Sequence, residues 1–81
     1  MTGLNVSDYL LMALPLAYYL NIDVKDTINY KGMTYVTSTF KVIGIVLLNN
    51  EEKGYQIKDI RYGITLNVTE HFIKKYFVKK L

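Results

Sequence analysis

The chain has 81 residues, of which 51% are hydrophobic, with no cysteine, one histidine and a formal net charge of +3. This length allows a single domain over residues 1–81, and the lack of cysteine excludes disulfides and thiolate metal sites. A chain of this size without disulfides or such metal sites needs a dense apolar core, oligomerisation or both for its stability.

An apolar segment dominates the N-terminal part of the chain. Residues 5–22 predict a helix, capped by Asn5 or Ser7, whose middle is apolar on every side. Pro15 would kink this helix or divide it into two. Because one sheet can cover only one side of such a helix, we expect a second copy of the protein to cover the other. The self-association candidates are Leu10, Leu11, Leu14, Leu16, Tyr18 and Tyr19.

After this segment the periodicity changes from helical to alternating, which predicts strands. Lys31-Gly32 reads as a two-residue hairpin turn in which glycine supplies a positive φ. Gly44 indicates a bulge or a sharp bend, and the polar residues 49–54 predict an exposed loop. The five predicted strands are residues 27–30, 33–40, 42–48, 55–61 and 64–68.

The last segment predicts a second helix, over residues 70–80, with Thr69 as its cap. Its apolar side chains form one stripe, made of Phe72, Ile73, Tyr76 and Phe77. The predicted fold class is therefore α+β. It comprises an N-terminal helix, a five-stranded antiparallel meander or small SH3-like or Sm-like barrel, and a short C-terminal helix.

The residues needed for catalysis are scarce. General acid–base chemistry needs a titratable pair held together, but His71 and Glu70 are adjacent on a predicted helix and point in different directions. The five glycines are isolated, so no phosphate-binding loop is indicated, and no nucleophile motif is present. We expect a protein that is not an enzyme, with no metal and no cofactor.

Binding surfaces are better represented. Four lysines and no acid lie in the last eleven residues, a concentration of charge that attracts phosphates or an acidic protein. A predicted hairpin adds basic and aromatic side chains, a combination that stacks nucleic-acid bases on sheet surfaces. The candidate residues for binding a partner or nucleic acid are Lys58, Arg61, Tyr62, Lys74, Lys75, Lys79 and Lys80.

The resulting hypothesis is a cytoplasmic, non-enzymatic interaction module that self-associates and binds a protein. Its small size and its residues with AT-rich codons suggest an accessory protein of viral or mobile-element origin that binds a host protein. One alternative is a small β-barrel that binds nucleic acid through the lysine-rich helix and the basic hairpin. Another is a membrane-surface protein using residues 9–20, although this segment has no flanking basic residue and no polar face.

Overall fold

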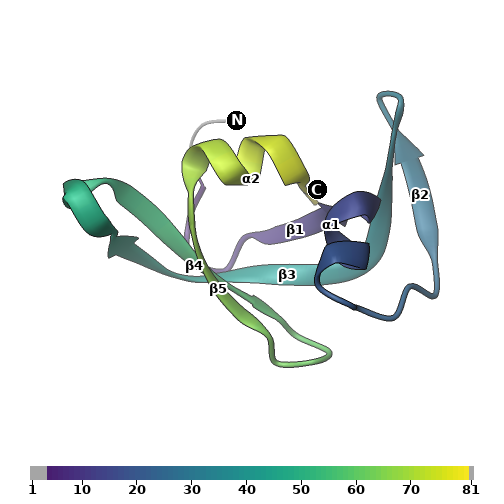
Figure 1. Ribbon diagram of the computed structural model, residues 1–81, viewed down its shortest axis with the longest axis horizontal. Helices are drawn as coiled ribbons and strands as arrows, with labels where there is room; N and C mark the ends of the chain where they lie inside the picture. Colours follow the sequence, from purple (N-terminus) through teal and green to yellow (C-terminus); the bar gives the residue numbers. More distant parts are fainter. Residues whose placement is uncertain (1–3, 81) are drawn as a thin grey trace.

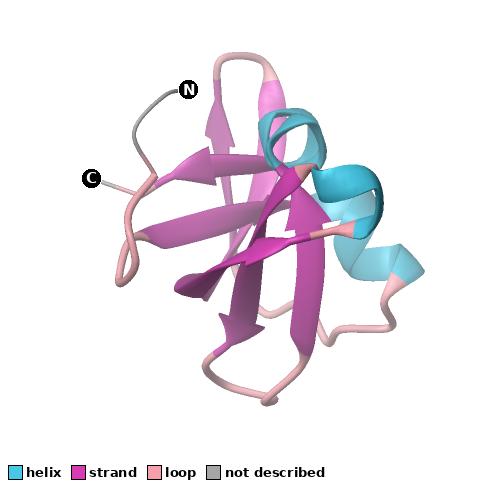
Figure 2. Cartoon of the chain, turned by 90° about the vertical axis from the view of Figure 1, so that its left-hand side faces the viewer, coloured by secondary structure: helices cyan, strands magenta, loops and turns pink. Residues whose placement is uncertain are grey.

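One strongly curled antiparallel sheet and two short helices form the fold (Figures 1 and 2). The computed structural model describes residues 4–80, without the side chains of residues 38, 39 and 50. The strands are β1 (Tyr9–Ala13), β2 (Thr27–Tyr30), β3 (Met33–Leu47), β4 (Lys53–Asp59), β5 (Thr65–Thr69) and β6 (Phe77–Lys79). The helices are α1 (Leu14–Tyr19) and α2 (Glu70–Tyr76), and η1 (Asn49–Glu51) is a 3₁₀ turn.

The long strand β3 organises the sheet. One of its edges pairs with β1, and the other pairs first with β2 and then with β4, which gives the order β5-β4-β3-β1-β6 with β2 off this path. The register shifts between Leu11 and Met12 in β1 and between Val42 and Gly44 in β3. Such bulges increase twist and bend the strands. The sheet therefore curls into a half-barrel, and both helices lie on its concave side (Figure 1).

The predicted N-terminal helix is wrong, and with it the predicted fold class. Residues 9–13 form strand β1 in the middle of the sheet, and only residues 14–19 are helical. The run is apolar on every side because both faces of β1 are covered, and periodicity alone does not distinguish a buried strand from a buried helix. Pro15 stands in the first turn of α1, where its missing N–H costs nothing, so it begins this helix instead of kinking a longer one.

The predicted five-stranded meander is also wrong. The predicted strands 33–40 and 42–48 are one continuous strand, β3. The predicted C-terminal helix stops at Tyr76, and Phe77 adopts an extended backbone (φ −135°, ψ 157°) that starts β6 beside β1. Phe77 belongs to the core as a strand residue, with its ring 5.4 Å from that of Phe40. Pairing of β1 with β3 and of β6 with β1 is therefore added to the consecutive pairs β2–β3, β3–β4 and β4–β5.

Three local predictions are confirmed. Lys31 and Gly32 both have positive φ, 50° and 80°, and close the β2–β3 hairpin. Gly44 lies at the bulge of β3. The Thr69 hydroxyl accepts a hydrogen bond of 3.0 Å from the Phe72 N–H and so caps α2. Each of these features depends on a few neighbouring residues only.

The core fills the concave side of the sheet, beneath the two helices. Its largest fully buried apolar side chains come from three strands, β1, β3 and β4, and from α2. They are Leu10, Met12, Val36, Phe40, Val42, Ile57 and Ile73. Asp59, at the end of β4, is also fully buried. Its Oδ1 accepts hydrogen bonds from the Arg61 N–H (2.8 Å) and the Tyr62 N–H (3.0 Å), so it holds the turn that leads into β5.

Candidate functional site

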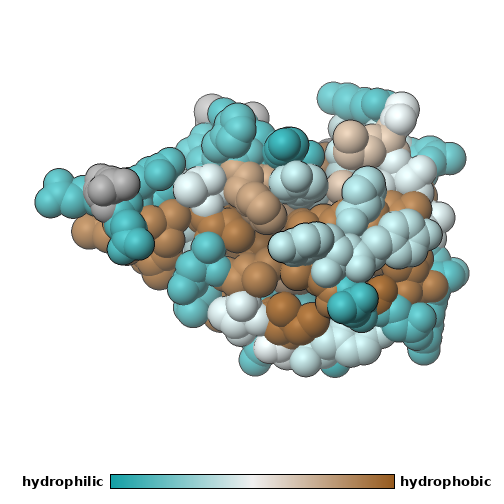
Figure 3. Space-filling view, viewed as in Figure 1, coloured by the Kyte–Doolittle hydropathy of each residue, from teal (hydrophilic) through white to brown (hydrophobic). Residues whose placement is uncertain are grey.

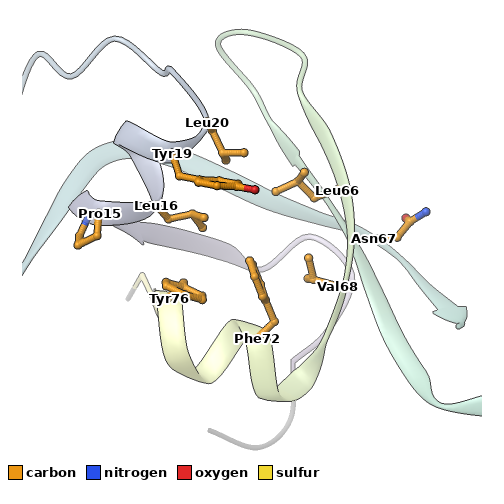
Figure 4. A pocket seen from close by; sticks show the side chains of 9 residues that line it. All are labelled: Pro15, Leu16, Tyr19, Leu20, Leu66, Asn67, Val68, Phe72 and Tyr76. Carbon is orange, nitrogen blue, oxygen red and sulfur yellow. The ribbon is translucent and has the colours of Figure 1, made fainter.

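An apolar groove of about 540 Å³ lies between α1, β5 and α2 (Figure 4). The surface around it is mostly apolar in its centre and polar at its margins (Figure 3). None of the residues that line it is charged. They are Pro15, Leu16, Tyr19, Leu20, Leu66, Asn67, Val68, Phe72 and Tyr76.

Helix α1 provides one wall of the groove. Leu16 is buried and anchors the helix, whereas Tyr19 is 82% exposed. The helix ends after about one and a half turns, where the Leu20 N–H donates to the Leu16 carbonyl (2.9 Å) and Asn21 takes a positive φ of 57°. Tyr19 and Leu20 are therefore held above β5 by a short, well-terminated helix.

Helix α2 provides the opposite wall. Phe72 and Tyr76 are one turn apart on this helix, and their rings lie 4.8 Å from each other. Ile73 is fully buried and fixes the helix to the core, so the Phe72 and Tyr76 rings stand in the groove (Figure 4). Two adjacent aromatic rings make a large apolar surface at low conformational cost.

Strand β5 forms the floor and ends the sheet on this side. Its first edge pairs with β4, and no other strand in residues 4–80 pairs with its second edge. The Asp59 N–H donates to the Ile64 carbonyl (2.8 Å), and hydrogen-bonded pairs alternate along an antiparallel ladder. The N–H and C=O groups of Thr65 and Asn67 consequently point away from β4. Leu66 and Val68 direct their side chains into the groove, and the Asn67 side chain points away from it (Figure 4).

The β5 edge lacks the devices that usually protect an exposed strand. Natural proteins protect such edges with lysine, proline, bulges or a covering element. The β5 sequence, Thr-Leu-Asn-Val-Thr, contains no charge and no proline, and its pairing with β4 is regular. Both edge and groove are therefore chemically suited to receive another strand.

A positive charge lies beside the groove. Lys75 Nζ lies 5.3 Å from the centre of the Tyr76 ring, in cation–π contact with a residue that lines the groove. Lys74, its neighbour on α2, is paired with Glu70 at 3.4 Å and is about half exposed. The α2 side of the groove thus favours a partner with an acidic group.

The predicted self-association residues are separated by the fold. Leu10 and Leu11 are buried in β1, inside the chain, so they are not available to a second copy. Leu16 is buried beside the groove. Tyr18 and Tyr19 remain exposed, at 66% and 82%. The all-round apolar helix that motivated self-association does not exist.

The predicted basic hairpin is mostly engaged within the chain. Arg61 Nη2 donates to the Asp23 carbonyl (3.1 Å), and its guanidinium lies 4.8 Å from the centre of the Tyr62 ring. The Tyr62 hydroxyl lies 3.5 Å from the same carbonyl. These contacts attach the β4–β5 turn to the loop before β2. Lys58 lies apart from them, on the outer face of the sheet.

The predicted lysine-rich helix face is divided between two elements. Lys74 and Lys75 are on α2, whereas Lys79 is in β6 and Lys80 follows it. Lys79 Nζ lies 3.4 Å from Asp8 Oδ2. The Asn5 backbone N–H, which donates to the same oxygen (2.8 Å), and the Lys79 ammonium hold the pKa of Asp8 below its ordinary value.

Sequence reasoning missed the groove as a site. It placed Leu66 and Val68 in the predicted strand 64–68 and Phe72 and Tyr76 on one helix stripe, but gave neither set a binding role. The signal that could have indicated more is the uncharged, proline-free β5 sequence, because an edge strand of this composition is exposed to pairing. The position of β5 at the end of the sheet depends on tertiary pairing, so it could not be predicted from the sequence.

Comparisons with known proteins were made at three levels. No family model, curated protein or solved structure matches the chain. Across residues 4–80, none of the helices has the length and apolar character to cross a membrane. In the same part of the chain, no three histidine or carboxylate side chains gather where they could hold a metal ion. The groove is therefore the feature from which a function is inferred.

Proposed function

We propose that this protein is a non-enzymatic interaction module that binds an extended segment of a partner protein as an added strand beside β5. The observation that carries the proposal is the free β5 edge that opens onto an apolar groove. In strand addition, main-chain hydrogen bonds provide affinity and pockets for alternate side chains provide specificity. Both requirements meet at β5.

The backbone of β5 supports the first requirement. Thr65 and Asn67 each direct an N–H and a C=O away from β4, and Asn67 is exposed. An incoming strand would exchange hydrogen bonds with these two residues, whether it pairs in the antiparallel or in the parallel direction. The protein needs no rearrangement of its own sheet to accept it.

The groove supports the second requirement. Successive side chains of a strand point to opposite faces, so every second side chain of the bound segment would face the same side as Leu66 and Val68. There it would contact Phe72 and Tyr76 on α2 and Tyr19 on α1. A volume of about 540 Å³ is in the range of ordinary ligand pockets. Large apolar side chains at alternate positions are the expected signature.

Charge further restricts the partner. Lys75 stands beside Tyr76 at the groove, and the groove lining itself carries no charge. A carboxylate in the bound segment, next to its apolar side chains, would face this lysine. The proposed ligand is thus an extended segment with alternating apolar residues and a flanking acidic residue.

Selection from a random peptide library displayed on phage tests the proposal. We expect enrichment of peptides with apolar side chains at every second position and an acidic residue beside them. Enrichment with helical spacing, at every third and fourth position, would contradict strand addition. So would a failure to enrich any sequence.

Two adjacent tyrosines provide a matched control. Tyr18 and Tyr19 are both on α1 and both exposed, but only Tyr19 lines the groove. Tyr19→Ala should weaken binding of a selected peptide, and Tyr18→Ala should leave it unchanged. Equal effects of the two substitutions would mean that the peptide binds elsewhere.

A second copy of the protein is the competing occupant of the β5 edge. It would appear as a dimer in sedimentation at tens of micromolar, which added peptide would dissociate. In such a dimer, β5 of a second molecule would take the place of the partner segment beside β5. A monomer that binds the selected peptides is the expected result.

A further inference from the structure

A row of basic side chains crosses the outer, convex face of the sheet, on the side opposite to the core. Lys58 in β4 pairs directly with Lys41 in β3, and Lys41 pairs with Tyr9 in β1. The Lys80 N–H, just after β6, donates to the Tyr9 carbonyl (2.8 Å). The outer basic row therefore consists of Lys58, Lys41, Tyr9 and Lys80, side by side across four neighbouring strands.

The orientation of the row follows from strand alternation. Val42, Ile57 and Leu10, the chain neighbours of row members, are fully buried in the core, so the row points the other way. Lys41 Nζ lies 5.8 Å from the centre of the Tyr9 ring, which confirms that the two side chains share a face. Lys58 and Lys80 are exposed.

Within the described part of the chain, no acidic side chain forms an ion pair with the lysines of this row. Like charges directly opposite each other on neighbouring strands are destabilising. The ion pairs of the described side chains involve Lys74 and Lys79, and none reaches Lys41, Lys58 or Lys80. The positions of β1, β3, β4 and β5 that share this face include no acidic residue. An external anion would relieve the repulsion.

An apolar cleft adjoins the Lys80 end of the row. It has a volume of about 180 Å³ and is separate from the groove beside β5. It contains the aromatic ring of Tyr30, which is 42% exposed and lies 6.4 Å from the Tyr35 ring in a T-shaped arrangement. The lining side chains are Leu11, Ile28, Tyr30, Val78, Lys79 and Lys80.

We propose that the outer basic row and this cleft bind a single-stranded nucleic acid. The row spans three interstrand spacings, about 14 Å, so it follows a linear polyanion and not a single small anion. Tyr9 within the row and Tyr30 in the cleft offer ring faces for unpaired bases, which a duplex keeps stacked. The surface is distinct from the groove of the proposed function, and it differs from the predicted basic hairpin, whose Arg61 and Tyr62 are engaged with Asp23.

Fluorescence polarisation with a labelled single-stranded oligonucleotide of about ten nucleotides tests the proposal. If the three lysines each contact one phosphate, a plot of the logarithm of the binding constant against the logarithm of the salt concentration should have a slope of about −2. Lys41→Gln should weaken binding and reduce that slope by about 0.7. Lys53→Gln makes the same charge change on the other face of β4, where Lys53 Nζ lies 5.5 Å from the centre of the buried Tyr55 ring, and should alter neither. Tyr30→Leu should weaken binding about tenfold and leave the slope unchanged.

Measurement of the melting temperature distinguishes a loss of oligonucleotide binding from a loss of folding. Because Lys41→Gln removes a like-charge contact, its melting temperature should not fall below that of the unaltered protein at low salt. If it does, Lys58→Gln provides the same test from the other strand. Lack of binding at about 50 mM salt would overturn the proposal. Equal effects of Lys41→Gln and Lys53→Gln, or equal affinity for a duplex of the same length, would also overturn it.

Discussion

Asn67 offers a way to remove a main-chain donor from the β5 edge while leaving the fold in place. Proline at this position lacks the N–H that points away from β4, and prolines occur naturally on edge strands with that side facing solvent. The bonds between β4 and β5 come from the neighbouring residues, Leu66 and Val68, and are retained. Asn67→Ala is the matched control, since it keeps the N–H and removes only a side chain that points away from the groove (Figure 4).

The size of the effect follows from the lost hydrogen bond. A neutral main-chain hydrogen bond contributes about 0.5–1.5 kcal/mol net, and a partner carbonyl left without a donor costs about 1–3 kcal/mol if it is shielded from water. Since about 1.4 kcal/mol corresponds to a factor of ten, Asn67→Pro should weaken binding of a selected peptide about tenfold or more. Asn67→Ala should change it by less than about twofold, because exposed side chains away from contacts have small effects.

Isothermal titration with one selected peptide measures both variants, and thermal unfolding checks that each is folded. If Asn67→Pro binds the peptide as tightly as Asn67→Ala, the peptide does not pair with β5. If both variants lose binding equally while remaining folded, the Asn67 side chain and not the strand edge is responsible. Either result would refute strand addition at this position.

Three further predictions concern stability. Thr69→Ala removes the cap of α2 and should lower the free energy of unfolding by about 1 kcal/mol in urea titrations, whereas Thr69→Ser should not. Asp59→Ala removes the carboxylate that holds the β4–β5 turn and should cost about 2 kcal/mol in the same assay, with Asp59→Asn less harmful because it keeps one acceptor. The pKa of Asp8 is lowered in the folded protein, so its stabilising contribution is present above about pH 4 and disappears as pH falls through the lowered pKa. The stability difference between the unaltered protein and Asp8→Asn should therefore shrink below about pH 4.

The parts of the fold that could be predicted from the sequence are those with local causes. Lys31-Gly32 favours a tight turn because glycine takes a positive φ without steric cost, and Thr69 has a hydroxyl at the start of an amphipathic turn. Each of these two predictions depends only on residues within four positions of one another. They fixed the β2–β3 hairpin and the start of α2 correctly.

The parts that could not be predicted depend on pairing between distant residues. Tyr9–Ala13 is a strand because it pairs with β3 on one edge and with β6 on the other. The apolar sequence of this segment does not indicate either partner. Phe77 continues the apolar stripe of α2, yet its place beside Met12 makes it extended. Tertiary pairing overrides local propensity at both positions.

The candidate surfaces share this dependence. Leu66, Val68, Phe72 and Tyr76 were identified as apolar positions, but a groove arises only because β5 is the last strand and α1 stands opposite. Lys41 and Lys58 become neighbours through a register that the bulge at Gly44 shifts by one residue. Without that register, the sequence shows two unrelated lysines.

Amide hydrogen exchange tests strand addition beside β5 most directly. In the free protein, the Leu66 and Val68 amides should be protected by β4, and the Thr65 and Asn67 amides should exchange quickly. On saturation with a selected peptide, we expect protection of the Thr65 and Asn67 amides. If the Asn67 amide still exchanges quickly while the peptide is bound, the bound segment does not extend the sheet and the proposed function is wrong.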